Sequence, residues 1–270
     1  MDKAILRFVH ISDTHYSPQS YDPPPSRLHP RECTHMLIEQ VNALPFTPDL
    51  ILHTGDVAYD PHPEIYPEAR DLFTTLKAPV VYVPGNHDHS AAMQDVLMGR
   101  SPEDITQPLY HTQAFNDVRF IFLDANSADI PPPAGEVSQA QLAWLAQQLD
   151  AHDPRPIVVA IHHPLMKTQF SAWYDEFMMT INGDAVHDLL KTAVDRVRGV
   201  FFGHVHQNIT FYRDGIMYSG VNSSWTQFYT LPDQGMETRN DLNADPAFNV
   251  VTLTDEGTIV QRYTYRVDAD

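Results

Sequence analysis

The sequence predicts an α/β protein in which two mixed β-sheets pack face to face with helices outside them, a four-layer αββα sandwich. Two observations predict this class. Up to about residue 207, short apolar segments rich in β-branched residues alternate with amphipathic helical patterns. After residue 207 the helical patterns stop, and consecutive hairpin-like segments follow. This order fits two packed sheets that are covered by helices.

The first part of the chain contains six predicted strands separated by helices. The strands are expected at 4–11, 50–53, 79–83, 119–123, 157–161 and 200–202. Each is almost continuously apolar, which is typical of a strand covered on both faces. Apolar residues recur at helical spacing over 37–44, 69–76, 142–149 and 186–197. Pro67 suits the first turn of the second helix, and Ser138 with Gln141 reads as a capping box for the third.

The last part of the chain predicts four further strands. These are expected at 208–212, 216–219, 248–253 and 258–265, with Asp214-Gly215 and Glu256-Gly257 as turns. No change in composition marks a linker. We therefore expect one domain over residues 1–270, with a cap-like insertion at about 165–182.

Composition excludes several classes of protein. The formal net charge of −18 disfavours binding to nucleic acid polymers or anionic membranes, which are themselves negative. The single cysteine, Cys33, cannot form an internal disulfide. No apolar run reaches the roughly 18–20 residues that span a bilayer, and the N-terminal segment lacks the features of a signal peptide. We therefore expect a cytoplasmic protein without membrane association.

Polar residues of a restricted kind follow the predicted strands. Five strands are followed at once by such side chains: Asp13 and His15, Asp56, Asn86 with His87 and Asp88, His162 with His163, and His204 with His206. The carboxyl ends of parallel strands form the ligand crevice of an open α/β sheet. Any one of these residues alone would read as a cap or loop residue, but the joint pattern predicts a common site.

The donor set at these strand ends suits metal ions. Carboxylate, amide and imidazole groups without a thiolate favour Mn, Fe, Co, Ni or Zn. Asp-x-His and His-x-His each place two side chains on the same side of an extended segment. Asp56 has two oxygens and could bridge two cations. The pattern therefore predicts a dinuclear centre.

The same series of motifs resembles the signature of the calcineurin-like metallophosphoesterase superfamily over about residues 8–206. Within it, the chain is similar to class III cyclic-nucleotide phosphodiesterases and their glycerophosphodiesterase relatives. The resemblance implies a first metal held by Asp13, His15, Asp56 and His206, and a second held by Asp56, Asn86, His162 and His204. It also implies that His87 acts as a catalytic residue beside the substrate phosphate and that Asp88 orients it. Leu165 departs from the pattern, because the superfamily often has a second proline there.

The resemblance implies a metal-dependent phosphoric ester hydrolase, which the predicted dinuclear centre would serve. We expect in-line attack of a metal-bridging hydroxide on a small phosphodiester, either a 3′,5′-cyclic nucleotide or a glycerophosphodiester. The cofactors would be two divalent ions, or Fe³⁺ with a divalent ion, drawn from Mn, Fe, Zn and Co. A phosphomonoesterase or nucleotidase is the alternative. A non-catalytic interaction scaffold ranks last, because all seven ligand positions are filled. The resemblance is also compatible with a homodimer.

The segment 166–181 leaves two interpretations open. Its aromatic residues Phe170, Trp173, Tyr174 and Phe177 could form a cap over the site, or a helix buried in the core or at a dimer interface. Lys167 and Asn222 are weaker candidates for substrate contacts.

Overall fold

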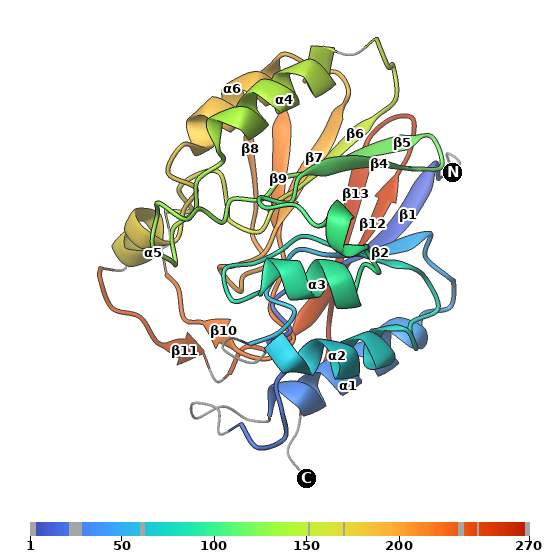
Figure 1. Ribbon diagram of the computed structural model, residues 1–270, viewed down its shortest axis with the longest axis vertical. Coiled ribbons are helices and arrows are strands. Elements are labelled where there is room, and N and C mark those ends of the chain that lie inside the picture. Colours follow the sequence, from blue (N-terminus) through green and yellow to red (C-terminus); the bar gives the residue numbers. More distant parts are fainter. Residues whose placement is uncertain are drawn as a thin grey trace.

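Two large β-sheets form the centre of the fold and face each other between helices (Figure 1). The computed structural model describes residues 4–21, 29–59, 63–150, 152–169, 171–231, 235–241 and 243–267. No helix in this described part is both long enough and apolar enough to cross a bilayer.

The first sheet combines the N-terminal strands with the C-terminal hairpin. It contains β1 (Leu6–Ile11), β2 (Leu50–His53), β3 (Val80–Tyr82), β12 (Ala247–Leu253) and β13 (Thr258–Thr264). The spatial order is β13-β12-β1-β2-β3. The pairs β1–β2 and β2–β3 are parallel, so these three strands end at the same edge of the sheet.

The second sheet is assembled from the middle of the chain. It contains β4 (His111–Phe115), β5 (Val118–Phe122), β6 (Ile157–Ala160), β7 (Val197–Phe202), β8 (Thr210–Arg213) and β9 (Ile216–Gly220). The spatial order is β4-β5-β6-β7-β9-β8. Strands β5, β6, β7 and β9 run parallel to one another. A separate two-stranded ribbon pairs β10 (Gln227–Phe228) with β11 (Asn240–Asp241).

Helices cover the outer face of each sheet. The elements are α1 (Pro30–Asn42), η1 (Pro63–Ile65), α2 (Tyr66–Phe73), α3 (Ser90–Val96), η2 (Pro102–Asp104), α4 (Gln139–Asp150), α5 (Ala172–Phe177) and α6 (Gly183–Lys191). Helices α1, α2 and α3 pack on the first sheet, and α4 with α6 packs on the second.

Three apolar clusters hold these layers together. Alternate residues of β1 point to opposite sides, so Phe8 enters the core between the sheets while Val9 packs toward the helices. Phe8 meets Phe120 and Phe201 of the opposite sheet edge to face, with ring centroids 5.6 and 5.2 Å apart. Each of these three rings is fully buried. The layers therefore stack in the order αββα, as the sequence predicts.

Several features of the fold were not given by the sequence pattern, including the following three. The β8–β9 hairpin extends the second sheet, whereas the β12–β13 hairpin extends the first, so the consecutive C-terminal strands separate between two sheets. Strand β4 is an edge strand with an exposed centre, and the apolar pattern does not predict it. The Ser138 hydroxyl accepts from Gln141 N, as in a capping box, but the Gln141 amide bonds to both main-chain groups of Asp124.

Candidate metal centre

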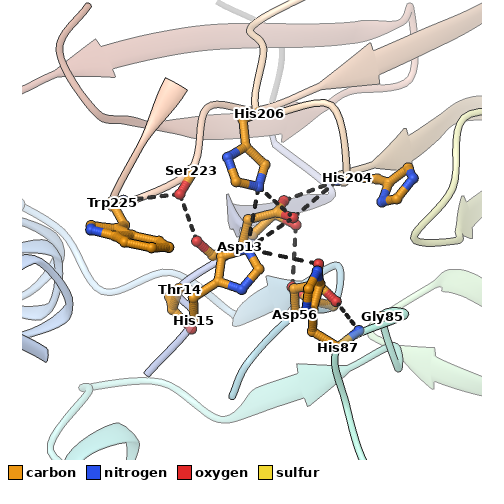
Figure 2. Close-up of polar contacts among 12 residues, drawn as sticks. Asp13, Thr14, His15, Asp56, Gly85, His87, His204, His206, Ser223 and Trp225 are labelled. Carbon is orange, nitrogen blue, oxygen red and sulfur yellow. Dashed lines mark hydrogen bonds and ion pairs between the residues drawn. The ribbon is translucent and has the colours of Figure 1, made fainter. Parts of the chain in front are cut away.

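The residues that follow the parallel strands meet at one place between the edges of the two sheets. Asp13 and Asp56 follow β1 and β2, while His162, His204 and His206 follow β6 and β7. Figure 2 shows that the side chains of Asp13, His15, Asp56 and His206 point toward one another. All of these side chains are buried, with no residue more than 4% exposed. The convergence expected from the sequence is therefore present.

The side chains form two groups that could each hold a metal ion. Asp13, His15 and His206 form one group, and Asp56, His162 and His204 form the other. Within each group the potential ligand atoms lie within 4.8 Å of one another.

Short distances define the first group. His206 Nε2 lies 3.3 Å from Asp13 Oδ1 and 3.3 Å from His15 Nε2. His15 Nε2 lies 4.0 Å from Asp13 Oδ1. Three potential ligand atoms from strand ends far apart in the chain therefore face a common point.

The second group is built in the same way around His162. Its Nε2 lies 3.3 Å from Asp56 Oδ2 and 3.1 Å from His204 Nδ1. Asn86 Oδ1, which the family resemblance places in this group, lies 3.2 Å from the same nitrogen. Asn86 follows β3 and is thus brought to the second group.

Asp56 joins the two groups. Its Oδ2 atom faces His162 Nε2 at 3.3 Å and His15 Nε2 of the first group at 3.8 Å. The other oxygen, Oδ1, accepts a 2.9 Å hydrogen bond from the main-chain N–H of His87. One carboxylate oxygen is therefore shared between the groups, while the second is held by the β3 turn.

The hydrogen bonds of two imidazoles show which nitrogen faces the centre as an acceptor. Nδ1–H of His162 donates to the Thr54 carbonyl at 2.7 Å, and Nδ1–H of His206 donates to the Thr226 carbonyl at 2.6 Å. In the neutral rings, both Nε2 atoms then direct a lone pair at carboxylate oxygens, which are acceptors too. Imidazole lone pairs that face carboxylate oxygens in a buried site repel one another unless a cation lies between them, so this arrangement suits a metal ion.

The electrostatics of the site also suit cations. Burial raises the pKa of Asp13 and Asp56. Nearby histidines, His206 for Asp13 and His162 for Asp56, lower the pKa by more than burial raises it, so both carboxylates are ionised. Among the described residues, only histidines lie within ion-pair distance of either carboxylate. Two buried anions without a lysine or arginine need another positive charge.

The histidines respond to the same environment in different ways. Burial lowers the pKa of His15 to about 3, and it lowers the pKa of His204 strongly. For His162 burial also lowers the pKa, but the Asp56 carboxylate outweighs it and the pKa rises to about 9. Without metal, the His162 ring therefore carries a proton on Nε2 that faces Asp56 Oδ2 within the second group, and a cation bound by this nitrogen would have to displace that proton.

The main chain at the site adopts a strained conformation. Positive φ angles occur at Asp13 (53°), His15 (45°), Asp56 (53°), His204 (68°) and His206 (48°). Residues other than glycine rarely adopt this left-handed region, and each instance costs of order 1–3 kcal/mol. Such strain persists only where the surrounding structure enforces it, and it is concentrated here on the candidate ligands.

The profile of the Calcineurin-like phosphoesterase family matches residues 6–208, which contain every one of these side chains. This chain belongs to that family. As a calcineurin-like phosphoesterase it is a phosphoric ester hydrolase, in agreement with the sequence-based expectation.

Individual relatives share a large part of this phosphoesterase. A 3′,5′-cyclic-nucleotide phosphodiesterase of Nostoc sp. is 29% identical over 215 residues, which is 78% of this chain and 74% of the relative. A glycerophosphodiester phosphodiesterase of Enterobacter lignolyticus is 30% identical over 215 residues, 77% of this chain and 74% of the relative. A dimetal phosphatase from Danio rerio shares the fold with a TM-score of 0.64 at 16% identity, covering 98% of this chain and all of that chain.

Asp88 of the phosphoesterase has contacts that the sequence does not reveal. Its carboxylate accepts hydrogen bonds from the main-chain N–H groups of Val57, Ala58 and Gly85 at 2.9–3.2 Å, and from the Tyr66 hydroxyl at 2.9 Å. Burial, with a smaller effect of Asp56, raises the pKa of Asp88 to about 6. These bonds tie the loop after β2 to the turn after β3.

Three aromatic rings that contact the first group, Tyr59, Trp225 and Phe228, are not among the candidates of the sequence analysis, whereas Tyr174 is. Tyr59 and Trp225 contact the His15 ring, each at 5.7 Å between centroids. Phe228 stacks on His206 at 4.4 Å, and Tyr174 of α5 packs on Phe228 at 5.3 Å. Tyr59 follows a predicted strand by a few residues, but no sequence periodicity indicates the ring contacts.

The described aromatic residues of the segment 165–182 differ in burial, with Trp173 half-buried. Tyr174 is 2% exposed, whereas Phe177 is 39% exposed. Phe170 lies outside the described residues. Lys167 is exposed, and the Asn222 side chain bonds to the main chain of Asn208 and Asp245 at 2.7 and 2.9 Å. The amide of Asn222 therefore supports the local loops.

Proposed function

We propose that this phosphoesterase hydrolyses small phosphodiesters with two metal ions. Asp13, His15, Asp56 and His206 would hold one ion. Asp56, Asn86, His162 and His204 would hold the other. The observation that carries the proposal is the shared Asp56 Oδ2 atom, which faces a histidine of each group at 3.3 and 3.8 Å. When bound, the two ions would supply Lewis acidity and a water of lowered pKa.

Side chains around the ions would set the charge of the site and stabilise the reacting phosphate. Asp13 and Asp56 neutralise part of the positive charge of the ions, which leaves a site that attracts a phosphodiester monoanion in a protein of net charge −18. His87 lies with its ring centroid 5.1 Å from that of His15, at the edge of the first group. From there it can donate a proton to the leaving oxygen or stabilise charge on the phosphoryl oxygens.

Asp88 would support this chemistry without touching the substrate. Its bonds to Ala58 N and Gly85 N hold two ligand-bearing loops in register, and Asp56 and Asn86 lie on these loops. This arrangement supports a positioning role for Asp88 through the main chain.

The names of the relatives support a phosphodiester substrate over a phosphomonoester. The Nostoc relative is named for 3′,5′-cyclic nucleotides and the Enterobacter relative for glycerophosphodiesters. Both names describe hydrolysis of a phosphodiester bond, so we propose phosphodiesters as the substrate class. The experiment below decides between cyclic nucleotides and glycerophosphodiesters.

The test is a substrate panel on purified protein stripped of metal and reloaded with Mn²⁺. It compares bis-p-nitrophenyl phosphate, p-nitrophenyl phosphate, 3′,5′-cyclic AMP and glycerophosphoethanolamine. We expect turnover of the diesters to exceed that of the monoester. The Asp56→Asn variant should lose most bound metal by elemental analysis, whereas Asp71→Asn, at an exposed helix position, should keep it. Preferential turnover of the monoester would contradict the diesterase proposal, and unchanged metal content in Asp56→Asn would contradict the shared ligand.

A further inference from the structure

Three aromatic rings form a column that ends at His87. The Tyr59 ring stacks on His87 with centroids 5.3 Å apart and planes only 20° from parallel. Tyr21 packs on Tyr59 at 4.8 Å with an angle of 39°. Parallel, closely spaced planes place the imidazole against the face of the Tyr59 ring, in the range typical of a favourable offset stack.

The main chain alone does not fix the orientation of the His87 ring. The N–H of His87 donates to Asp56 Oδ1 at 2.9 Å, which fixes the position of the main chain. The side chain still has two torsions, and the second is broad in histidine. Two rings that contact the imidazole are Tyr59, which offers its face, and His15, which meets it edge to face at 81°.

Tyr59 is itself held by elements that also hold metal-binding residues. Its main-chain N–H donates to the Tyr16 carbonyl at 3.3 Å, next to His15. The Trp225 ring stands at 87° to Tyr59, with centroids 6.3 Å apart, and contacts His15 at 5.7 Å. Figure 2 shows Trp225 anchored to the Asp13 segment through Ser223. The column is thus part of the same frame as the first ligand group.

We propose that Tyr59 is a positioning residue for His87, whose imidazole it holds at the edge of the first ligand group by face-to-face stacking. This inference rests on the proposed function, because it assigns Tyr59 a role through His87 in phosphodiester hydrolysis. The ring of Tyr59 is the required feature and its hydroxyl is not. Removing the ring should let the imidazole sample other rotamers, so that fewer molecules hold it in the productive orientation.

A double-mutant cycle tests the proposal on the full-length, Mn²⁺-loaded protein with bis-p-nitrophenyl phosphate. The variants are Tyr59→Leu, Tyr59→Phe, His87→Ala and the double variant Tyr59→Leu/His87→Ala. We expect Tyr59→Leu to lower kcat by about tenfold to a hundredfold while KM changes less than about twofold. Tyr59→Phe should retain kcat within about twofold. In the His87→Ala background, Tyr59→Leu should cause no further loss.

Two measurements separate positioning from general damage. Bound metal and the thermal unfolding midpoint of each variant should match those of the wild type. In the protein loaded with diamagnetic Zn²⁺ instead of Mn²⁺, the side-chain proton resonances of His87, assigned by their loss in His87→Ala, should shift in Tyr59→Leu because the ring current of Tyr59 is removed. They should stay near their original positions in Tyr59→Phe.

The outcomes distinguish this inference from the function on which it rests. Additive losses in the double variant, equal losses in Tyr59→Leu and Tyr59→Phe, or unshifted His87 resonances would overturn the positioning role while the hydrolase activity stands. Full activity of His87→Ala would do the same. A wild-type protein that hydrolyses no phosphate ester would overturn the proposed function and the positioning role together.

Discussion

The hydroxyl of Ser223 donates a 2.7 Å hydrogen bond to the main-chain carbonyl of Asp13, which lies 210 residues earlier in the chain. The same hydroxyl oxygen accepts a 2.9 Å bond from the N–H of Trp225. The Gln227 side chain closes this loop by bonding to both main-chain groups of Ser223. A C-terminal loop therefore supports the first candidate ligand in the sequence.

Ser223→Ala should destabilise the protein and loosen the first ligand group. The substitution removes a buried donor and acceptor, so we expect the free energy of unfolding to fall by about 1–3 kcal/mol. Urea denaturation of the metal-free protein measures this change, and Mn²⁺ titration should show weaker binding. Ser224→Ala is the matched control, because Ser224 Oγ is also buried but has no hydrogen-bond partner among the described residues. Equal losses in the two variants would contradict the role of the Ser223 bond.

Gly85→Ala should disturb Asp56 and weaken metal binding. A Cβ atom at Gly85 would lie 2.1 Å from Asp56 Oδ1 and 2.3 Å from Asp56 N, so the shared carboxylate must move. We expect Mn²⁺ affinity to fall at least about tenfold, which calorimetric titration measures.

Gly257→Ala provides the control for this prediction. A Cβ atom at Gly257 meets no atom within 4 Å, and the residue lies in the turn between β12 and β13. Its Mn²⁺ affinity should equal that of the wild type. A Gly85→Ala protein that binds Mn²⁺ as tightly as Gly257→Ala would show that the Asp56 carboxylate tolerates displacement.

The strands and the candidate ligands were predictable because their signals are local. An apolar run that ends in Asp, Asn or His marks both the strand and the edge at which it ends, as at Asp13 and Asp56. Parallel pairing then brings these ends together within each sheet. Packing of the two sheets against each other brings Asn86, after β3, within 3.2 Å of His162, after β6.

One supporting pair could have been found by the same rule. The predicted strand at 119–123 is followed by Asp124 and Asn126, which the sequence-based reasoning left aside. In the structure, the Asn126 amide donates to the carbonyls of Pro84 and Gly85 at 3.3 and 3.1 Å. This end of β5 therefore supports the turn that carries Asn86.

Other features depend on tertiary contacts that leave no pattern in the sequence. The contacts of Asp88 to Val57, Ala58 and Gly85 amides join two separate loops, so its support of the main chain could not be predicted from its place beside His87. The Tyr59 stack has the same origin. The division of the two C-terminal hairpins between sheets is also tertiary, since each hairpin has the same local signal.

The single cysteine should be unreactive in the folded protein. Cys33 is 1% exposed, and burial raises the pKa of its thiol to about 12, so the reactive thiolate is scarce at neutral pH. We expect an aromatic disulfide reagent at pH 8 to label no thiol in the native protein and one thiol per chain in urea. Cys33→Ser should give no signal in either state. Rapid labelling of the native protein would show that the helix α1 region opens readily.

His10 should make the metal-free protein less stable as the pH falls. Burial lowers the pKa of His10 from 6.5 to about 3, while its Nε2 contacts Thr54 Oγ1 at 3.0 Å and its ring meets Phe201 edge to face. Between these two pKa values the unfolded chain binds a proton that the folded chain does not. Stability from this residue is therefore present above pH 6.5 and is lost toward pH 3, by about 1.4 kcal/mol per pH unit.

A His10→Phe variant isolates this contribution, because phenylalanine keeps the ring against Phe201 and cannot be protonated. Urea denaturation in the presence of a chelator, at pH values from 7.5 to 4.5, gives the slope of stability against pH for both proteins. The slope below pH 6.5 should be smaller in the variant by about 1.4 kcal/mol per pH unit, the effect of one proton. The absolute stability of the variant does not matter for this comparison, since only the slopes are compared. Parallel curves would mean that His10 is protonated in the folded protein as easily as in the unfolded chain, and that the acid sensitivity arises elsewhere.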